Sequence, residues 1–158
     1  MRRREFLQAA AAVFAASAES RAAETQTDPW SANQLLEPAA LAEMLRAQKA
    51  PVILFVGFPV LYRQKHIANA ILAGPASKPE GLNQLKQAVA KMPKTAPIVI
   101  YCGCCPMVRC PNLRPAFSAL RDLGFTQLRV LNLPTNFHTD WAAKGYPVQS
   151  SLRSAQTQ

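Results

Sequence analysis

The sequence predicts an α/β domain in which a central, mostly parallel sheet of about five strands lies between helices on both faces. Two short apolar runs rich in β-branched residues, at residues 52–56 and 98–101, are typical of strands buried on both sides. Segments with apolar residues at helical spacing alternate with these runs. Because parallel strands need crossover connections, this alternation predicts a three-layer sandwich.

The first part of the domain is expected to supply an edge strand, a helix and a buried strand. Residues 35–36 form the short edge strand, and Pro38 follows where the first turn of a helix tolerates proline. Apolar residues at positions i, i+3 and i+4 predict a one-sided helix over residues 39–48. Pro51 separates this helix from the continuous apolar strand at residues 52–56.

A loop-rich segment leads to the second amphipathic helix. Glycine and proline follow residue 56 directly, so residues 62–66 are expected as a loop or a short helix. Residues 67–72 are mostly apolar and contain a brief strand. Residues 80–92 place leucines, alanine and valine on one face and lysines on the other, which predicts a helix.

The second half of the domain begins with the strand at residues 98–101, which stops at a cluster of cysteines. A helix at residues 113–123 follows and is ended by Gly124. Residues 128–133 are expected as another strand and residues 139–144 as a short last helix. Because ligands of parallel sheets bind at the carboxyl ends of strands, the cysteine cluster lies where a site is expected.

The amino terminus has the composition of an export signal. Three arginines precede Glu-Phe-Leu, an alanine-rich stretch and an Ala-x-Ala sequence at residues 16–18, which looks like the twin-arginine type. This signal predicts a periplasmic protein with no stable membrane span after cleavage. The expected organisation is a signal peptide at 1–18, a flexible lead-in at 19–33, the domain at 34–150 and a disordered tail at 151–158.

Composition and charge narrow the class of partner. Hydrophobic residues make up 49% of the 158 residues and charged residues 17%, which fits a globular chain. The formal charge is +9, and it falls to +7 when the three arginines and Glu5 leave with the signal. This balance suits a small anionic substrate. The basic residues are scattered, without an aromatic-interleaved patch, so nucleic acid is not an expected partner.

All four cysteines lie within nine residues, ahead of the helix that begins at Leu113. Structural disulfides confined to so short a loop would restrain little chain entropy, and a bridge between adjacent Cys104 and Cys105 would be strained. A redox-active, metal-binding or sulfur-carrying loop explains the cluster better. The amino end of the following helix would push a thiol there toward its nucleophilic thiolate form.

The spacing Cys-x-Cys-Cys-x4-Cys also offers soft ligands at Cys102, Cys104, Cys105 and Cys110. Thiolates suit Cu(I), Zn²⁺ or an iron–sulfur cluster. The spacing matches no standard pair of Cys-x2-Cys units, and no Cys-x-x-Cys-His haem motif occurs, so no single cofactor follows from the sequence. A periplasmic metal-binding protein is therefore the alternative to a catalytic thiol.

Four segments occur in an order that carries a family resemblance. Lys-His-Ile-Ala-Asn-Ala at residues 65–70 stands where the family has a Gly-His-Ile-Pro-Gly-Ala type segment. A strand ending in Tyr-Cys at 101–102, a helix ending Leu-x-x-Leu-Gly at 120–124 and a closing Lys-Gly-Tyr-Pro-Val at 144–148 follow. Over residues 35–148 the chain thus resembles the rhodanese-like (sulfurtransferase) family, which implies a rhodanese-like fold.

The resemblance implies a persulfide on the cysteine that follows the central strand, and this role falls on Cys102. The family's Cys-x4-Arg loop is reproduced by Cys104 with Arg109, so Cys104 is the alternate nucleophile. Arg109 and Arg114 are expected to hold the charge of an anionic donor. The remaining thiols are expected to resolve the persulfide or to bind a metal: Cys104, Cys105 and Cys110.

The expected function is a thiosulfate sulfurtransferase-like activity. Sulfane sulfur would move from a small anionic donor through the cysteine persulfide to a thiol acceptor or a protein partner.

The cysteine loop is about five residues longer than is typical of the family, and Gly57 and its neighbours replace an acidic residue that often follows the second strand. His138 could approach the loop as a base or a ligand, and Asn112 is expected to cap the helix after the loop.

Overall fold

The computed structural model describes residues 27–152, so the expected signal peptide and parts of the lead-in and tail lie outside the described residues. Five strands form one parallel sheet in the order β1-β6-β5-β2-β4. The strands are β1 (Leu35–Leu36), β2 (Val52–Phe55), β4 (Ile71–Leu72), β5 (Ile98–Tyr101) and β6 (Leu128–Leu131). The predicted class and the parallel sheet of about five strands are confirmed.

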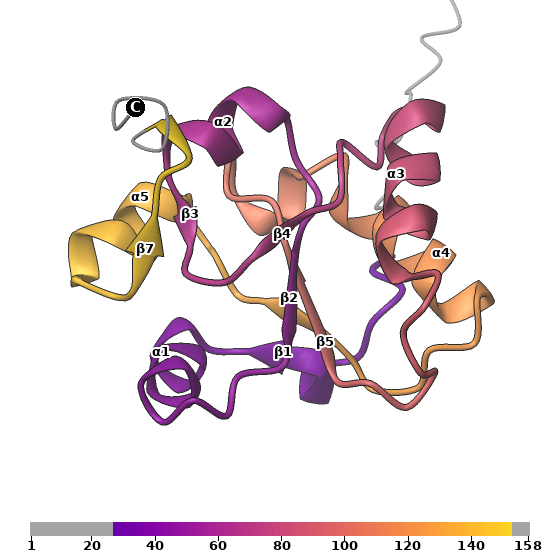
Figure 1. Ribbon diagram of the computed structural model, residues 1–158, viewed down its shortest axis with the longest axis horizontal. Coiled ribbons are helices and arrows are strands. Elements are labelled where there is room, and N and C mark those ends of the chain that lie inside the picture. The colour runs from indigo at the N-terminus through magenta and orange to yellow at the C-terminus, as the bar shows by residue number, and fades with distance from the viewer. Residues whose placement is uncertain (1–26, 153–158) are drawn as a thin grey trace, which may run out of the picture.

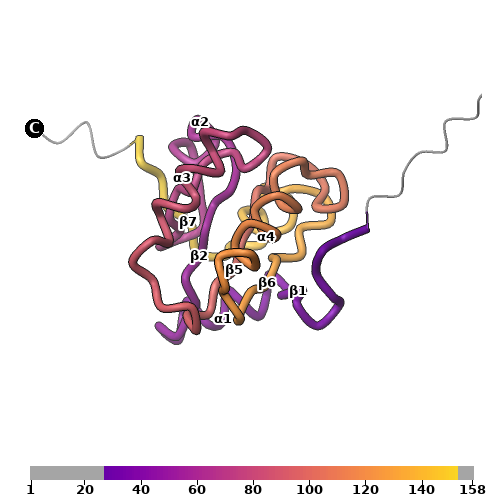
Figure 2. The backbone as a smooth tube through the Cα atoms, turned by 90° about the vertical axis from the view of Figure 1, so that its right-hand side faces the viewer, coloured from indigo at the N-terminus to yellow at the C-terminus, as the bar shows by residue number. Residues whose placement is uncertain are grey.

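Helices cover both faces of the sheet (Figure 1). α3 (Pro79–Val89) and α4 (Leu113–Asp122) pack on one face and lie side by side in Figure 2. α1 (Pro38–Arg46) packs on the other face, where α5 (Phe137–Asp140) joins it. α2 (Pro59–Gln64) follows the carboxyl end of β2. Within residues 27–152 no helix is long and apolar enough to cross a membrane.

The central strands are apolar throughout because both of their faces are buried. Along β2 and β5, Leu54 and Ile100 face the α3 and α4 layer, whereas Ile53 and Val99 face the α1 layer. All four side chains are at most 2% exposed. The two cores therefore share one continuous sheet. The chain passes from the carboxyl end of β5 directly into the cysteine loop.

Three local details differ from the expected elements. The segment 67–72 supplies two strands, because Asn69 adopts a left-handed conformation with φ of 64° between β3 (His66–Ile67) and β4. β3 pairs antiparallel with β7 (Val148–Gln149), a two-residue strand too short to give a sequence pattern. The last helix is divided into α5 and a 3-10 turn, η3 (Ala142–Lys144).

Part of the expected flexible lead-in is packed on the domain. Trp30 is 8% exposed, and its ring meets Phe117 of α4 edge-on at a centroid distance of 5.6 Å. Asp28 forms an ion pair with Arg114 at 2.6 Å. The short 3-10 turn η1 (Ala32–Gln34) then leads into β1. Residues 28–34 therefore belong to the packed structure, ahead of the core strand that begins the predicted domain.

Candidate active site at the cysteine loop

The cysteine loop leaves the carboxyl end of β5 and is held by the segment that follows β6. The N–H of Phe137 donates to the carbonyl oxygen of Gly103 at 2.9 Å, and the N–H of Met107 donates to that of Leu133 at 3.0 Å. Gly103 has φ of +80°, and a Cβ there would lie 2.6 Å from Cβ of Phe137. Only glycine fits this turn, because both the backbone conformation and the contact exclude a side chain.

The loop gathers its thiols at short range. Sγ of Cys102 lies 3.3 Å from Sγ of Cys104, which lies 3.4 Å from Sγ of Cys105. The sulfur atoms of Cys102, Cys104 and Cys110 all lie within 4.8 Å of one another. Cys102 and Cys110 are buried, whereas Cys104 is exposed, and all four cysteines carry free thiols. The structure thus brings the predicted nucleophile together with its alternate.

Asn112 contributes to the site in a way that the sequence did not predict. Its side chain is fully buried, its Oδ1 accepts a hydrogen bond from the N–H of Ser77 at 2.9 Å, and its Nδ2 donates to Sγ of Cys102 at 3.4 Å. Asn112 occupies the N-cap position of α4, as predicted, but its side chain makes no capping hydrogen bond, because these two buried partners take up the amide instead. Asn112 therefore fixes the Cys102 sulfur from the α4 side.

Raised pKa values favour the protonated form of the Cys102 and Cys104 thiols. The hydrogen bond with Cys104 lowers the pKa of Cys102, but the Cys110 thiol and burial raise it more strongly, to about 11. Hydrogen bonding to Cys102 and burial raise the pKa of Cys104. The expected shift toward the thiolate is therefore wrong for the free-thiol state, because the long loop surrounds Cys102 with other thiols and with apolar core.

A cavity of about 480 Å³ opens beside Cys102 and Cys104. Gly57 packs closely against two of the cavity's lining residues, because a Cβ there would lie 2.7 Å from Cζ of Phe55 and 3.1 Å from Sγ of Cys102. The cavity is lined by the exposed side chains of Lys65 and His138. The remaining wall comes from the end of β2, α2, the turn at Gly103, and the segment of α5 and η3. It consists of Phe55, Leu61, Gln64, Gly103, Asn136, Phe137 and Ala142.

The two predicted anion-binding arginines lie outside the described lining of this cavity. Arg109 is exposed at the end of η2 (Met107–Arg109). Arg114 is held away by its ion pair with Asp28 and by donating to the carbonyl oxygen of Val108 at 3.1 Å. Lys65, which follows α2, supplies the positive charge at the cavity instead. Sequence spacing gave no signal for it, because α2 and the cysteine loop are brought together only by the fold.

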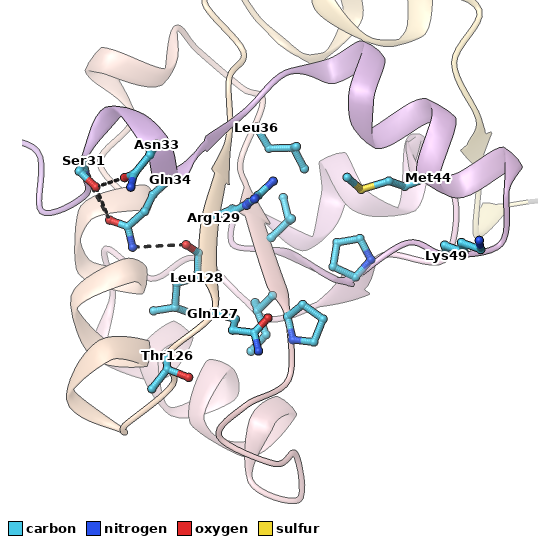
Figure 3. A pocket seen from close by; sticks show the side chains of 14 residues that line it. Ser31, Asn33, Gln34, Leu36, Met44, Lys49, Thr126, Gln127, Leu128 and Arg129 are labelled. Carbon is cyan, nitrogen blue, oxygen red and sulfur yellow. Dashed lines mark hydrogen bonds between the residues drawn. The ribbon is translucent and has the colours of Figure 1, made fainter.

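A second and larger cavity, of about 680 Å³, lies at the amino ends of β2, β5 and β6 (Figure 3). Lys49, Gln127 and Arg129 contribute to its polar wall. At its edge, Nε2 of Gln34 donates to the carbonyl oxygen of Leu128 at 3.4 Å. Its lining contains no thiol, so among the described residues the nucleophilic groups gather at the opposite end of the sheet.

The architecture is similar to that of several solved structures, one of which is a rhodanese-like domain. The rhodanese-like domain of the Alr3790 protein from Anabaena sp. aligns with a TM-score of 0.56 at 20% identity, covering 79% of this chain and 85% of that chain. The BH2092 protein from Bacillus halodurans aligns with a TM-score of 0.58 at 19% identity, covering 74% and 77%. At these identities, the likeness establishes the fold.

A third similar structure is a thiosulfate sulfurtransferase from Pseudomonas aeruginosa, with a TM-score of 0.54 and 23% identity. The alignment covers 74% of this chain but only 19% of that protein. The comparison with curated proteins gives no significant match. The family model of the rhodanese-like domain matches residues 37–133, which include β5, the cysteine loop and α4. With the fold and more than half of its sequence in agreement, this chain belongs to the rhodanese-like domain family.

Proposed function

We propose that the protein is a sulfurtransferase that accepts sulfane sulfur from an anionic donor such as thiosulfate on Cys102. The thiolate of Cys102 attacks the outer sulfur of the donor, the sulfur–sulfur bond of thiosulfate breaks, and sulfite leaves with the bonding electron pair. The product on the protein is a Cys102 persulfide. A thiol acceptor, either a small molecule or a protein partner, then takes the sulfur.

The observation that supports this proposal most strongly is the position of Cys102 at the carboxyl end of β5, beside a cavity that Lys65 makes basic. Cys102 is only 2% exposed, so a donor would reach its sulfur through this cavity. Nδ2 of Asn112 offers a hydrogen bond to the sulfur, which favours its charged form against the effect of burial. Lys65 would attract the anionic donor.

Release of sulfite tests the first step directly, because it does not depend on where the sulfur goes next. Purified protein, reduced and treated with a chelator, is given thiosulfate and a dithiol, and sulfite is measured over time. We expect sulfite from the wild type and none above background from Cys102→Ser. Val108→Ala is the matched control, because its side chain is 60% exposed in the same loop. Equal sulfite from Cys102→Ser and the wild type would refute the assignment.

The thiol cluster also favours a second candidate function, binding of a soft metal ion. The sulfur atoms of Cys102, Cys104 and Cys110 lie within 4.8 Å of one another, an arrangement that suits a thiolate-rich site for Cu(I) or Zn²⁺. Elemental analysis of protein recovered from its native compartment would give near-stoichiometric metal if this function holds. Metal-free protein whose melting temperature does not rise on adding Cu(I) or Zn²⁺ would refute it.

We further propose that the protein acts in the periplasm after twin-arginine export. The support lies in residues 1–18, outside the described part of the chain. Cell fractionation of the tagged protein should find a shortened form in the periplasm. Replacing Arg3 and Arg4 by lysine should leave the full-length form in the cytoplasm. Periplasmic delivery that is unchanged by this double substitution would argue against the twin-arginine route.

A further inference from the structure

The exposed thiol of Cys104 lies against the sulfur that the proposed function loads. The two Sγ atoms are 3.3 Å apart, and Cys102 is buried while Cys104 faces the solvent. We propose that Cys104 is the thiol that resolves the Cys102 persulfide, and that its attack releases the sulfur as hydrosulfide. This inference rests on the proposed function, and it changes the product from a transferred sulfur atom to free sulfide.

The step balances without an added oxidant. Sγ of Cys104 attacks Sγ of the Cys102 persulfide, the Cys104–Cys102 disulfide forms and the persulfide S–S bond breaks. The terminal sulfur leaves as hydrosulfide with the bonding electron pair and the proton of the Cys104 thiol. Two thiols are oxidised to a disulfide, and one sulfane sulfur is reduced to sulfide.

The geometry favours Cys104 over the other two thiols. A disulfide needs the sulfur atoms to close from 3.3 Å to about 2 Å, a small movement for an exposed side chain. Gly103, with φ of +80°, turns the chain so that its two neighbours bring their thiols together. Cys105 contacts Cys104, at 3.4 Å, and Cys110 is a buried residue held in the core beside α4.

Turnover requires an external dithiol, which is the partner class that this inference names. A disulfide that closes a loop of three residues and has one accessible sulfur has little entropic stabilisation and is readily reduced. An incoming thiolate attacks the accessible sulfur of Cys104, and Cys102 leaves as the thiolate that starts the next cycle. The net reaction converts thiosulfate and a dithiol into sulfite, hydrosulfide and a disulfide. The chemistry is that of a sulfane-sulfur reductase.

A single-turnover experiment tests the role of Cys104. The protein is reduced, freed of metal and of reductant under anaerobic conditions, and mixed with one equivalent of thiosulfate. Sulfite, sulfide, free thiols and intact mass are then measured. We expect the wild type to release one sulfite and one sulfide per chain and to lose two thiols, and peptide mapping to find the Cys102–Cys104 disulfide.

Variants separate this inference from the proposed function. Cys104→Ser should release sulfite, retain the mass of one added sulfur atom and release no sulfide, and Cys104→Ala repeats the test with a different side chain. Val108→Ala should behave as the wild type, and thermal unfolding confirms that each variant folds. Sulfide release at the wild-type rate from both Cys104 variants, or a stable persulfide in the wild type, would overturn the role of Cys104 alone.

Two other outcomes would reach further. If neither the wild type nor any variant releases sulfite, the proposed function is refuted. This inference, which rests on it, is then refuted as well. If Cys102→Ser gains sulfur while both Cys104 variants gain none, Cys104 is the nucleophile, and the assignment of nucleophile and resolving thiol is overturned.

Discussion

The two ends of the central sheet carry cavities that differ in size and in chemistry. The cavity at the amino ends of the strands measures about 680 Å³, against about 480 Å³ at the carboxyl ends. Both have basic side chains in their walls, Lys49 and Arg129 at one end and Lys65 at the other. Of the two, only the smaller cavity has thiols in its wall beside a basic side chain, and the buried amide of Asn112 donates to one of those thiols. The two cavities therefore differ less in volume than in the groups that converge on them.

The largest expected difference between the two ends is in sulfur loading. Replacing Cys102 by serine should lower sulfite release by a factor of about 10³ or more, because the nucleophile is removed. Arg129→Ala removes a charge from the amino-end cavity and should leave the rate unchanged. Initial rates with thiosulfate measure both. A large loss in Arg129→Ala would reverse the comparison and point to the larger cavity.

The carboxyl end should also be the end whose chemistry depends on pH. The pKa of Cys102 is raised to about 11, so its reactive thiolate is scarce near neutral pH. The initial rate of sulfite release should therefore rise about tenfold per pH unit between about pH 7 and pH 9. Stopped assays in buffers of constant ionic strength measure the profile. A plateau reached below about pH 8 would show that the thiol is activated in the presence of the donor.

A pair of glycines compares the packing of the two ends. Gly103 has φ of +80° and Gly124 has φ of +89°, so both adopt a left-handed backbone conformation. A Cβ at Gly103 would contact Phe137, whereas a Cβ at Gly124 would meet nothing within 4 Å. Gly124→Ala should cost about 1–2 kcal/mol from backbone conformation alone, and Gly103→Ala about 2–4 kcal/mol with the added contact. Urea denaturation measures both. Equal losses would show that Phe137 moves aside freely.

The smallest expected difference is the loss of stability when a buried side-chain amide, rather than an exposed one, is replaced by alanine. Asn112→Ala removes the acceptor of the Ser77 N–H and one of the hydrogen bonds of the Cys102 sulfur, and should cost about 1–3 kcal/mol of stability. Gln127→Ala, at the exposed rim of the amino-end cavity, should stay within about 0.5 kcal/mol. Asn112→Ala should also slow sulfite release, because a donor to the thiolate is lost. An unchanged rate would leave Asn112 a structural role only.

Much of the fold follows from the sequence because its strands are short, apolar and regularly separated by amphipathic helices. The run that forms β5 and the helix that forms α4 were predicted to within one residue at each end. β7 gave no pattern, since two exposed residues that pair with β3 carry no periodicity. Local signals specify elements that bury one face or two, and miss those that depend on a distant partner.

The candidate site shows the same limit. The thiol cluster was evident from spacing, because neighbours along a short loop must lie close in space. The other polar groups of the site were not evident, because Asn112 precedes α4 and Lys65 follows α2. Only the fold brings the Asn112 amide to Cys102 and Lys65 to the same cavity. The expected thiolate also depended on the surroundings, because burial and neighbouring thiols outweigh the end of a helix.

The two tryptophans of the chain have a consequence for the smallest unit that can fold. Trp30 packs in the core on the α4 side of the sheet. Trp141 is fully buried in the core on the α1 side. Both lie beyond residues 37–133, the range that matches the family. Replacing either tryptophan by alanine would lower the free energy of unfolding by about 3–5 kcal/mol. A fragment cut to residues 37–133 lacks both side chains and would expose the core on each face of the sheet. Their fluorescence offers a separate optical reporter for each half of the core.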